Sequence, residues 1–181
     1  MLSVELEFVP GRTARVNPVA IPDCSGVYAI VMPGGDHQVN KDLLRRAGEV
    51  DFFATWPVLY VGATDDSLRS RIKAHYCRDS RSSTFRRSLG AFAADTLGLD
   101  IQRFPGSRVF CFHDEAPLTA WLEAETIFGF CPSEEPFSLE KVVLSAAPGL
   151  FNLGQREPTP VTRVVRDLRQ QASGRGQHAP F

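Results

Sequence analysis

Short stretches of apolar and β-branched residues recur along the chain and predict strands. Residues 3–9 (SVELEFV) alternate polar and apolar side chains, which is typical of a strand with one buried face. Residues 26–31 (GVYAIV) and 58–62 (VLYVG) are β-branched and aromatic, which favours two further strands. The segments 108–112 (RVFCF) and 126–130 (TIFGF) have the same character. Short strands far apart in the sequence are therefore expected to form the sheet.

Apolar positions three or four residues apart predict helices between these strands. The clearest helix covers residues 66–76, where Leu68, Ile72 and Tyr76 fall on one stripe. The other expected helices are 40–53 with Asn40 as N-cap, a helix from the Ser82-Ser83 pair to Gly98, 117–123, 136–147, and one starting at Thr159-Pro160. Trp56-Pro57 is expected to break the chain before the strand at 58–62. Interleaved helices and strands indicate an α+β or α/β fold.

The composition is that of an ordinary globular domain, with 43% hydrophobic and 23% charged residues in 181 positions. No apolar run reaches about 18 residues, so no membrane-spanning helix is expected. The first residues lack the features of a signal peptide, which favours a cytoplasmic protein. The cysteines, Cys24, Cys77, Cys111 and Cys131, form no C-x-x-C pair, and this argues against a zinc ribbon or a disulfide framework.

The formal net charge of −1 means that any contact with nucleic acid must rely on a local basic surface. Residues 69–87 contain such a concentration, with one acid, Asp79, among many bases. The basic residues of this run are Arg69, Arg71, Lys73, Arg78, Arg81, Arg86 and Arg87. A solvated helix face is the simpler interpretation, and a surface that follows a phosphate backbone is the functional one.

Two tyrosines lie in the most strand-like segments. Tyr28 shares a strand face with Ile30, and Tyr60 is expected to share one with Val58, because alternate residues of a strand face the same way. If these strands pair antiparallel, both phenols project from the same side of the sheet. Each tyrosine alone is explained equally well by packing on a half-buried sheet.

Other polar residues follow at spacings that allow chemistry. Arg71 and His75, four residues apart on a helix, are neighbours on one face and could bind a phosphate. Glu140 is expected in a first helical turn. The helix dipole favours an acid there without any function, and the functional interpretation is a ligand for a hard cation. Asn152, among apolar neighbours, would ordinarily satisfy nearby backbone groups.

The order of these pieces resembles the GIY-YIG nuclease superfamily. Gly26-Val27-Tyr28 resembles its first motif and Tyr60-Val61-Gly62 its second; Arg71 and His75, then Glu140 and Asn152, follow in the family's order. The resemblance covers roughly residues 24–153. It departs from the family in the 32 positions between the tyrosines, where a short turn is usual.

This resemblance implies an α+β fold, with a small, mainly antiparallel sheet flanked by helices and a helical insertion at about 33–57. Residues 1–160 would form one nuclease domain, and 161–181 a C-terminal helix and a disordered tail. The implied activity is metal-dependent hydrolysis of phosphodiester bonds in DNA, with RNA as an open alternative.

The resemblance also implies a role for each residue. Glu140 would bind Mg²⁺ or Mn²⁺, Arg71 the phosphate, and Tyr28 or His75 would be the general base, with Tyr60 and Asn152 in support. Lys73, Arg78, Arg81, Arg86 and Arg87 would contact the nucleic acid. Two alternatives remain open: a binding module of this fold that no longer cleaves, and an interaction protein that matches by chance.

Overall fold

The computed structural model describes residues 4–47, 52–53, 56–104, 107, 109–153 and 160–174. Its strands are β1 (Glu7–Pro10), β2 (Gly26–Val31), β3 (Phe52–Phe53), β4 (Trp56–Thr64), β5 (Ile101–Arg103), β6 (Phe110–Phe112) and β7 (Ile127–Pro132). Its helices are α1 (Gly11–Val16), a 3₁₀ turn (Pro18–Ala20), α2 (Gln38–Ala47), α3 (Leu68–Tyr76), α4 (Thr84–Leu97), α5 (Ala116–Glu125), α6 (Pro136–Ala146) and α7 (Pro160–Ala172).

The main sheet has the strand order β1-β7-β2-β4-β3 within the described residues, and every neighbouring pair is antiparallel. β2 and β4 are neighbours, with Tyr28 opposite Gly62 and Ile30 opposite Tyr60. The expected antiparallel α+β fold is therefore confirmed, and the insertion between the tyrosines does not separate their strands.

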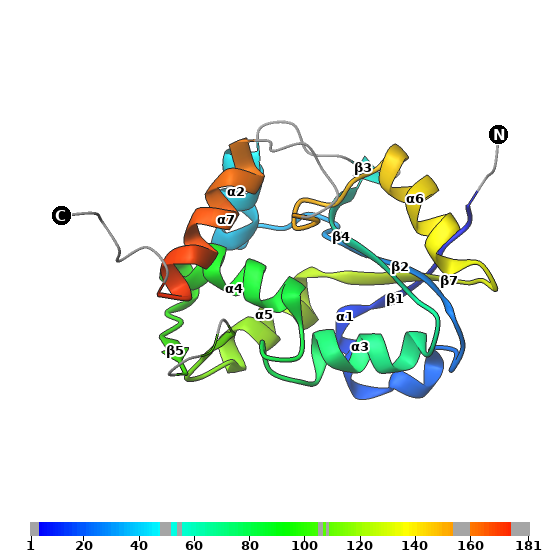
Figure 1. Ribbon diagram of the computed structural model, residues 1–181, viewed down its shortest axis with the longest axis horizontal. Coiled ribbons are helices and arrows are strands. Elements are labelled where there is room, and N and C mark those ends of the chain that lie inside the picture. The colour runs from blue at the N-terminus through cyan, green and yellow to red at the C-terminus, as the bar shows by residue number, and fades with distance from the viewer. Residues whose placement is uncertain are drawn as a thin grey trace.

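The two faces of this sheet are covered differently (Figure 1). On one face, Tyr28 and Ile30 join a large cluster with residues of α1, α3, α4 and α5. On the other, Val27 and Val61 pack with aliphatic residues of α6 such as Val143. In β2 the side chains alternate between the two faces, because neighbouring strand positions point to opposite sides of a sheet.

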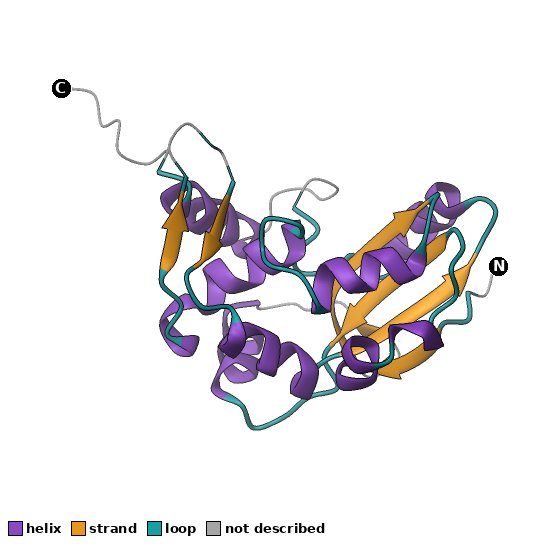
Figure 2. Ribbon diagram, turned by 90° about the horizontal axis from the view of Figure 1, so that it is seen from below, coloured by secondary structure: helices purple, strands orange, loops and turns teal. Residues whose placement is uncertain are grey.

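The insertion does not stand apart from the rest of the molecule. Val39 and Leu43 of α2 are buried in the same cluster as Val165 and Ala172 of α7, and α2 lies against α4 and α7. Figure 2 shows the main sheet at one end of the molecule and the smaller β5–β6 pair at the other, with helices between them. The inserted helix thus helps to build the helical half of the core.

Local signals fix the helices next to the sheet. The Ser67 side chain accepts a hydrogen bond from the Ser70 N–H at the start of α3, and Ser83 does the same for Arg86 at the start of α4. Gly98 ends α4 in the left-handed conformation, with φ of 64°. None of the helices within the described ranges is both long and apolar enough to cross a membrane.

Several expected boundaries were wrong. The helix expected over 40–53 is α2, which starts before Asn40, and residues 52–53 are a strand. Asn40 is not an N-cap, because its side-chain oxygen accepts from the Trp121 indole and its amide donates to Glu125. Trp56-Pro57 does not break the chain but begins β4. The strand expected at 3–9 is β1, which begins only at Glu7.

Parts of other expectations lie outside the described residues. They include the N-cap at Thr159 and the tail beyond Gly174. The short elements α1 and β5 were not expected at all, since neither contains enough periodic positions to stand out from its surroundings.

Candidate active site

The two tyrosines lie together on one face of the sheet. The centroids of their rings are 6.2 Å apart. The regular part of the register places them there, because Tyr60 lies opposite Ile30, which shares a face with Tyr28. Beyond this point the register shifts, since Val31 pairs with Val58. The expectation that Val58 shares the face of Tyr60 was therefore wrong: Val58 packs in the aliphatic cluster under α6. One extra residue in a strand reverses its alternation, which the sequence pattern does not show.

Gly62 makes room for Tyr28. A Cβ atom at Gly62 would lie 2.5 Å from the Tyr28 hydroxyl oxygen and 2.6 Å from Cζ, so the phenol ring passes directly over this position. Gly26 is equally confined, since a Cβ there would lie 2.5 Å from the Cys131 carbonyl oxygen. Gly62 is thus required by the close approach of Tyr28, and Gly26 by the close approach of β7.

His75 connects Tyr28 to the start of α4. Its Nε2 lies 3.0 Å from the Tyr28 hydroxyl and its Nδ1 lies 2.8 Å from the Ser83 hydroxyl. The histidine is only 5% exposed, and burial, together with the charges of Arg71 and Arg86, lowers its pKa to about 3. A neutral imidazole with both nitrogens engaged holds the Tyr28 hydroxyl in place and is poorly suited to accept a proton.

The two phenols differ in their access to solvent. Tyr28 is 3% exposed, whereas Tyr60 is half-buried. Burial raises the pKa of Tyr28 above its ordinary value, with a smaller contribution from charge on Tyr60. Burial also raises the pKa of Tyr60, and the negative charge of Glu140 adds to it. Both hydroxyls are therefore protonated near neutral pH unless positive charge is brought close.

Arg71 and Glu140 supply opposite charges to this pair. Arg71 lowers the pKa of both tyrosines and Glu140 raises it, so both groups lie within electrostatic reach of both phenols. Arg71 is exposed and lines a pocket with Ser70 and Arg78. Glu140 is half-buried on α6 and lines a second pocket with Phe137 and Lys141. The two side chains come from different helices, α3 and α6.

Asn152 fixes the strand that carries Tyr60. Its Oδ1 accepts from the Val61 N–H at 2.8 Å and its Nδ2 donates to the Val61 carbonyl at 2.7 Å. Gly149 allows the loop to approach this closely, because a Cβ there would lie 2.7 Å from the Tyr60 Cα. The Asn152 amide therefore satisfies two backbone groups of Val61 and, by the same hydrogen bonds, holds the strand of Tyr60 in place.

The comparisons with known proteins agree with this geometry. A family model described as the GIY-YIG catalytic domain matches residues 26–171, which is most of the chain. The chain belongs to the GIY-YIG family. Neither a search of curated proteins nor one of solved structures finds a match to it.

GIY-YIG membership suggests nuclease activity in general, and GIY-YIG nucleases generally use divalent metal ions. Among the described residues, no group of three or more His, Cys, Asp and Glu side chains could hold a metal. A zinc site of three or four protein ligands therefore does not fit the described donors. Glu140, a single carboxylate lining a pocket, fits Mg²⁺, because that ion keeps several waters and takes oxygens from substrate phosphates.

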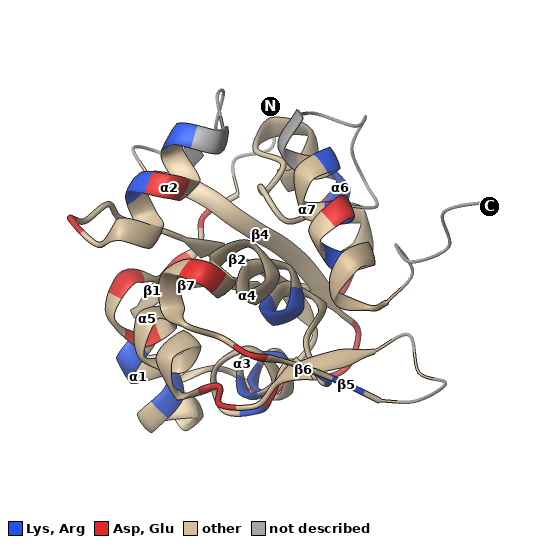
Figure 3. Cartoon of the chain, turned by 90° about the vertical axis from the view of Figure 1, so that its left-hand side faces the viewer, with Lys and Arg blue, Asp and Glu red and all other residues tan. Residues whose placement is uncertain are grey.

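The residues expected to contact nucleic acid differ in exposure and in the partners that already engage them. Lys73, Arg78 and Arg81 are exposed, and Arg81 pairs with Asp79. Arg87 is half-buried and donates to the Ser80 and Arg81 carbonyls. Figure 3 shows that basic residues are distributed over several elements, with acidic residues among them.

Arg86 corrects the expectation most clearly. Its side chain is 0% exposed and lies 2.7 Å from the Glu115 carboxylate. It also donates to the His75 carbonyl at 3.0 Å and to the Thr119 hydroxyl at 2.9 Å. A guanidinium so enclosed cannot reach a nucleic acid, so Arg86 supports the His75 backbone from inside the fold.

Sequence reasoning missed the partners of the site. Ser83 was recognised only as a helix cap, although it also holds His75. Arg166 and Arg169, at i and i+3 on α7, line a pocket with Arg87. Their spacing places them on one helix face, which was the available signal.

Proposed function

We propose that this chain is a metal-dependent endonuclease that hydrolyses phosphodiester bonds in DNA. The observation that carries the proposal is the tyrosine pair of β2 and β4, with Arg71 and Glu140 both within electrostatic reach of it. This set unites a phosphate clamp, a carboxylate for a hard cation and hydroxyl groups that can handle a proton. Those are the parts that hydrolysis of a phosphodiester requires.

Arg71 binds the scissile phosphate. Its guanidinium is exposed, lies at the wall of a pocket, and can donate two parallel hydrogen bonds to phosphate oxygens. The negative charge on those oxygens grows as water adds to phosphorus, so the same bonds strengthen in the transition state.

Glu140 holds the cation. The Glu140 carboxylate would hold a divalent ion, which when bound would supply positive charge to offset the negative charge of the phosphate. The Glu140 carboxylate lies within electrostatic reach of the tyrosines as well, because its charge raises the pKa of both.

Tyr28 accepts the proton from the attacking water, and His75 positions it. Tyr28 must first lose its own proton, which its raised pKa opposes until positive charge is added. Arg71 already lowers that pKa in the free protein. The buried His75, with a pKa of about 3, is the weaker candidate for the base because both ring nitrogens are engaged with protein groups. Tyr60, more exposed, holds the water beside Tyr28.

The competing function is a nucleic-acid-binding module of the same fold that does not cleave. The burial of Tyr28, at 3% exposed, is the observation that favours it. The two functions differ in cleavage and agree in binding, so one experiment with both readouts separates them.

The test is nicking of supercoiled plasmid by the purified protein, with and without Mg²⁺ or Mn²⁺, and with RNA in parallel. We expect nicking that EDTA stops. Glu140→Gln should fold normally, bind DNA as the wild type does, and lose cleavage by roughly three orders of magnitude or more, because it lacks the charge that the cation needs.

Glu134→Gln is the matched control, since Glu134 is an exposed acid just before the same helix. It should cleave at the wild-type rate. A wild type that binds DNA but never nicks it with either ion would establish the binding module instead. Cleavage by Glu140→Gln near the wild-type rate would show that the carboxylate is misassigned.

A further inference from the structure

A pocket between α4 and α7 contains three arginines and, among its described lining residues, no acid. Its volume is about 390 Å³, and its walls include Arg87 of α4 with Arg166 and Arg169 of α7. Gln170 and Ser173 add neutral polar groups, while Leu153 and Phe110 form apolar walls. The volume equals that of about a dozen waters at ~30 Å³ each, so a phosphodiester group fits.

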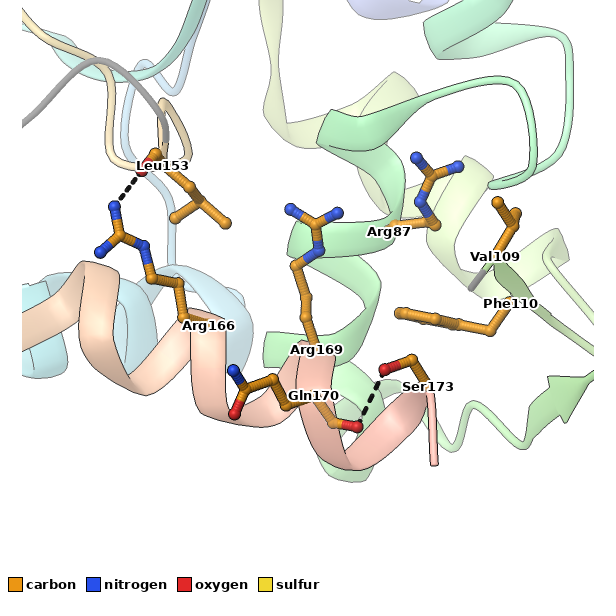
Figure 4. A pocket seen from close by; sticks show the side chains of 8 residues that line it. All are labelled: Arg87, Val109, Phe110, Leu153, Arg166, Arg169, Gln170 and Ser173. Atoms are coloured by element: carbon orange, nitrogen blue, oxygen red, sulfur yellow. Dashed lines mark hydrogen bonds between the residues drawn. The ribbon is translucent and has the colours of Figure 1, made fainter. Parts of the chain in front are cut away.

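The arginines differ in how far the protein already engages them. Arg87 donates to the Ser80 and Arg81 carbonyls and to the Thr84 hydroxyl, and Arg166 donates to the Leu153 carbonyl. No other described residue makes a side-chain hydrogen bond or an ion pair with Arg169. Figure 4 shows the guanidinium groups of Arg87 and Arg169 turned toward the same side of the pocket.

This concentration of positive charge is unfavourable in the free protein. Burial lowers the pKa of Arg87 and of Arg169, and the charge of Arg87 lowers that of Arg169 further. Like charges held together in a partly dry site are stabilised when an anion enters. Guanidinium groups match a phosphate in charge and in hydrogen-bond geometry.

The pocket adjoins the tyrosine pair. Arg169 is one of the cations that lower the pKa of Tyr60, so it lies within electrostatic reach of that phenol. Leu153, in the pocket wall, directly follows Asn152, whose amide holds the strand of Tyr60. Arg71 lowers the pKa of the same phenol, so the charges of both arginines act on Tyr60.

We propose that Arg169, with Arg87 and Arg166, forms a second phosphate subsite, which binds a backbone phosphate of the nucleic acid flanking the one at Arg71. This rests on the proposed function for its ligand, and it assigns to the C-terminal helix a part in holding the substrate. Free phosphate could bind to the same arginines, so the experiment uses a DNA duplex and inorganic phosphate as separate probes.

The test is binding of a fluorescein-labelled DNA duplex in EDTA, measured by anisotropy over a series of KCl concentrations. Arg169→Ala should weaken binding by about tenfold at low salt and reduce the slope of log K against log salt by roughly 1, as expected for one lost phosphate contact. Arg169→Lys keeps the positive charge, and its affinity should lie between those of Arg169→Ala and the wild type. Thermal melts establish that each variant is folded.

Arg163→Ala is the matched control, because Arg163 is an exposed arginine of the same helix that does not line the pocket. It should bind like the wild type. Equal affinity and salt slope for Arg169→Ala and Arg163→Ala would overturn the subsite. So would calorimetric binding of inorganic phosphate that Arg169→Ala abolishes while duplex binding stays unchanged.

Cleavage is scored separately from binding. If Arg169→Ala loses duplex affinity while the wild type never nicks DNA, the subsite stands and the nuclease proposal fails. If the wild type nicks DNA and Arg169→Ala binds it equally well, the subsite alone fails.

Discussion

The two faces of the β2–β4 pair are built from neighbouring residues and yet differ in kind. The face under α6 is aliphatic, with Val27, Val61 and Val143 in contact. The opposite face carries Tyr28 and Tyr60, with His75 bonded to Tyr28. Apolar contacts need no partner beyond close packing, whereas each buried hydroxyl and imidazole needs one. The face under α6 is therefore held by packing alone, whereas the opposite face combines packing with polar groups that each need a partner.

The sharpest way to break this comparison is to change adjacent residues on opposite faces. Tyr28→Phe should lower the cleavage rate by roughly 10²–10⁴ if its hydroxyl transfers the proton. It should cost only about 1–3 kcal/mol in stability, from the unpaired nitrogen of His75. Val27→Ala, next in sequence and fully buried, should cost about 2 kcal/mol and leave the rate of the folded protein unchanged.

Single-turnover nicking and urea unfolding on both variants measure the two effects. If Val27→Ala cleaved as slowly as Tyr28→Phe, the proposed difference between the two faces would be contradicted.

The tyrosine face is also supported by a buried ion pair, because Arg86 pairs with Glu115 and donates to the His75 carbonyl. Arg86→Ala should destabilise the protein by about 3–5 kcal/mol, because it leaves the Glu115 carboxylate without its partner. Arg78→Ala, at an exposed position of the same basic run, should change stability by less than about 0.5 kcal/mol. Chemical denaturation compares them, and equal midpoints would refute the structural role of Arg86.

The last expected effect is a pH dependence confined to the tyrosine face. The pKa of His75 is lowered to about 3 in the folded protein, from its ordinary 6.5. Between these values the unfolded chain binds the proton and the folded one does not, so stability falls as the pH drops below 6.5. The contribution is at most about 1.4 kcal/mol per pH unit and is absent above that range. His75→Gln should flatten this part of the stability profile; an unchanged slope from pH 6.5 to 4 would contradict the assignment.

The sequence was informative wherever local rules decide the structure. β2 spans Gly26–Val31 as expected, and Ser83 and Gly98 bound α4 as their capping preferences predict. The antiparallel pairing of the tyrosine strands also followed from their β-type pattern and family order. The strand and the helix ends depend on residues close in sequence, and the pairing of the two strands was implied by the order of the family's motifs.

The remainder depends on partners far away along the chain. Arg86 looked like its exposed neighbours because nothing in residues 69–87 reveals that Glu115 and Thr119 enclose it. Similarly, the shift in register at Val58 arises from the pairing of β4 with β2. The arginine pocket needs α4 and α7 to meet, and their contact is a property of the packed fold.

The loop after α6 has a consequence for self-association. A strand edge with unpaired backbone groups invites another chain to add a strand. Along β4, the N–H groups of Leu150 and Phe151 donate to the Val58 and Leu59 carbonyls, and the amide of Asn152 occupies both backbone groups of Val61. These β4 groups are thereby withheld from a strand of a second molecule. Resistance to aggregation at this edge and the alignment of Tyr60 are therefore secured by one set of bonds.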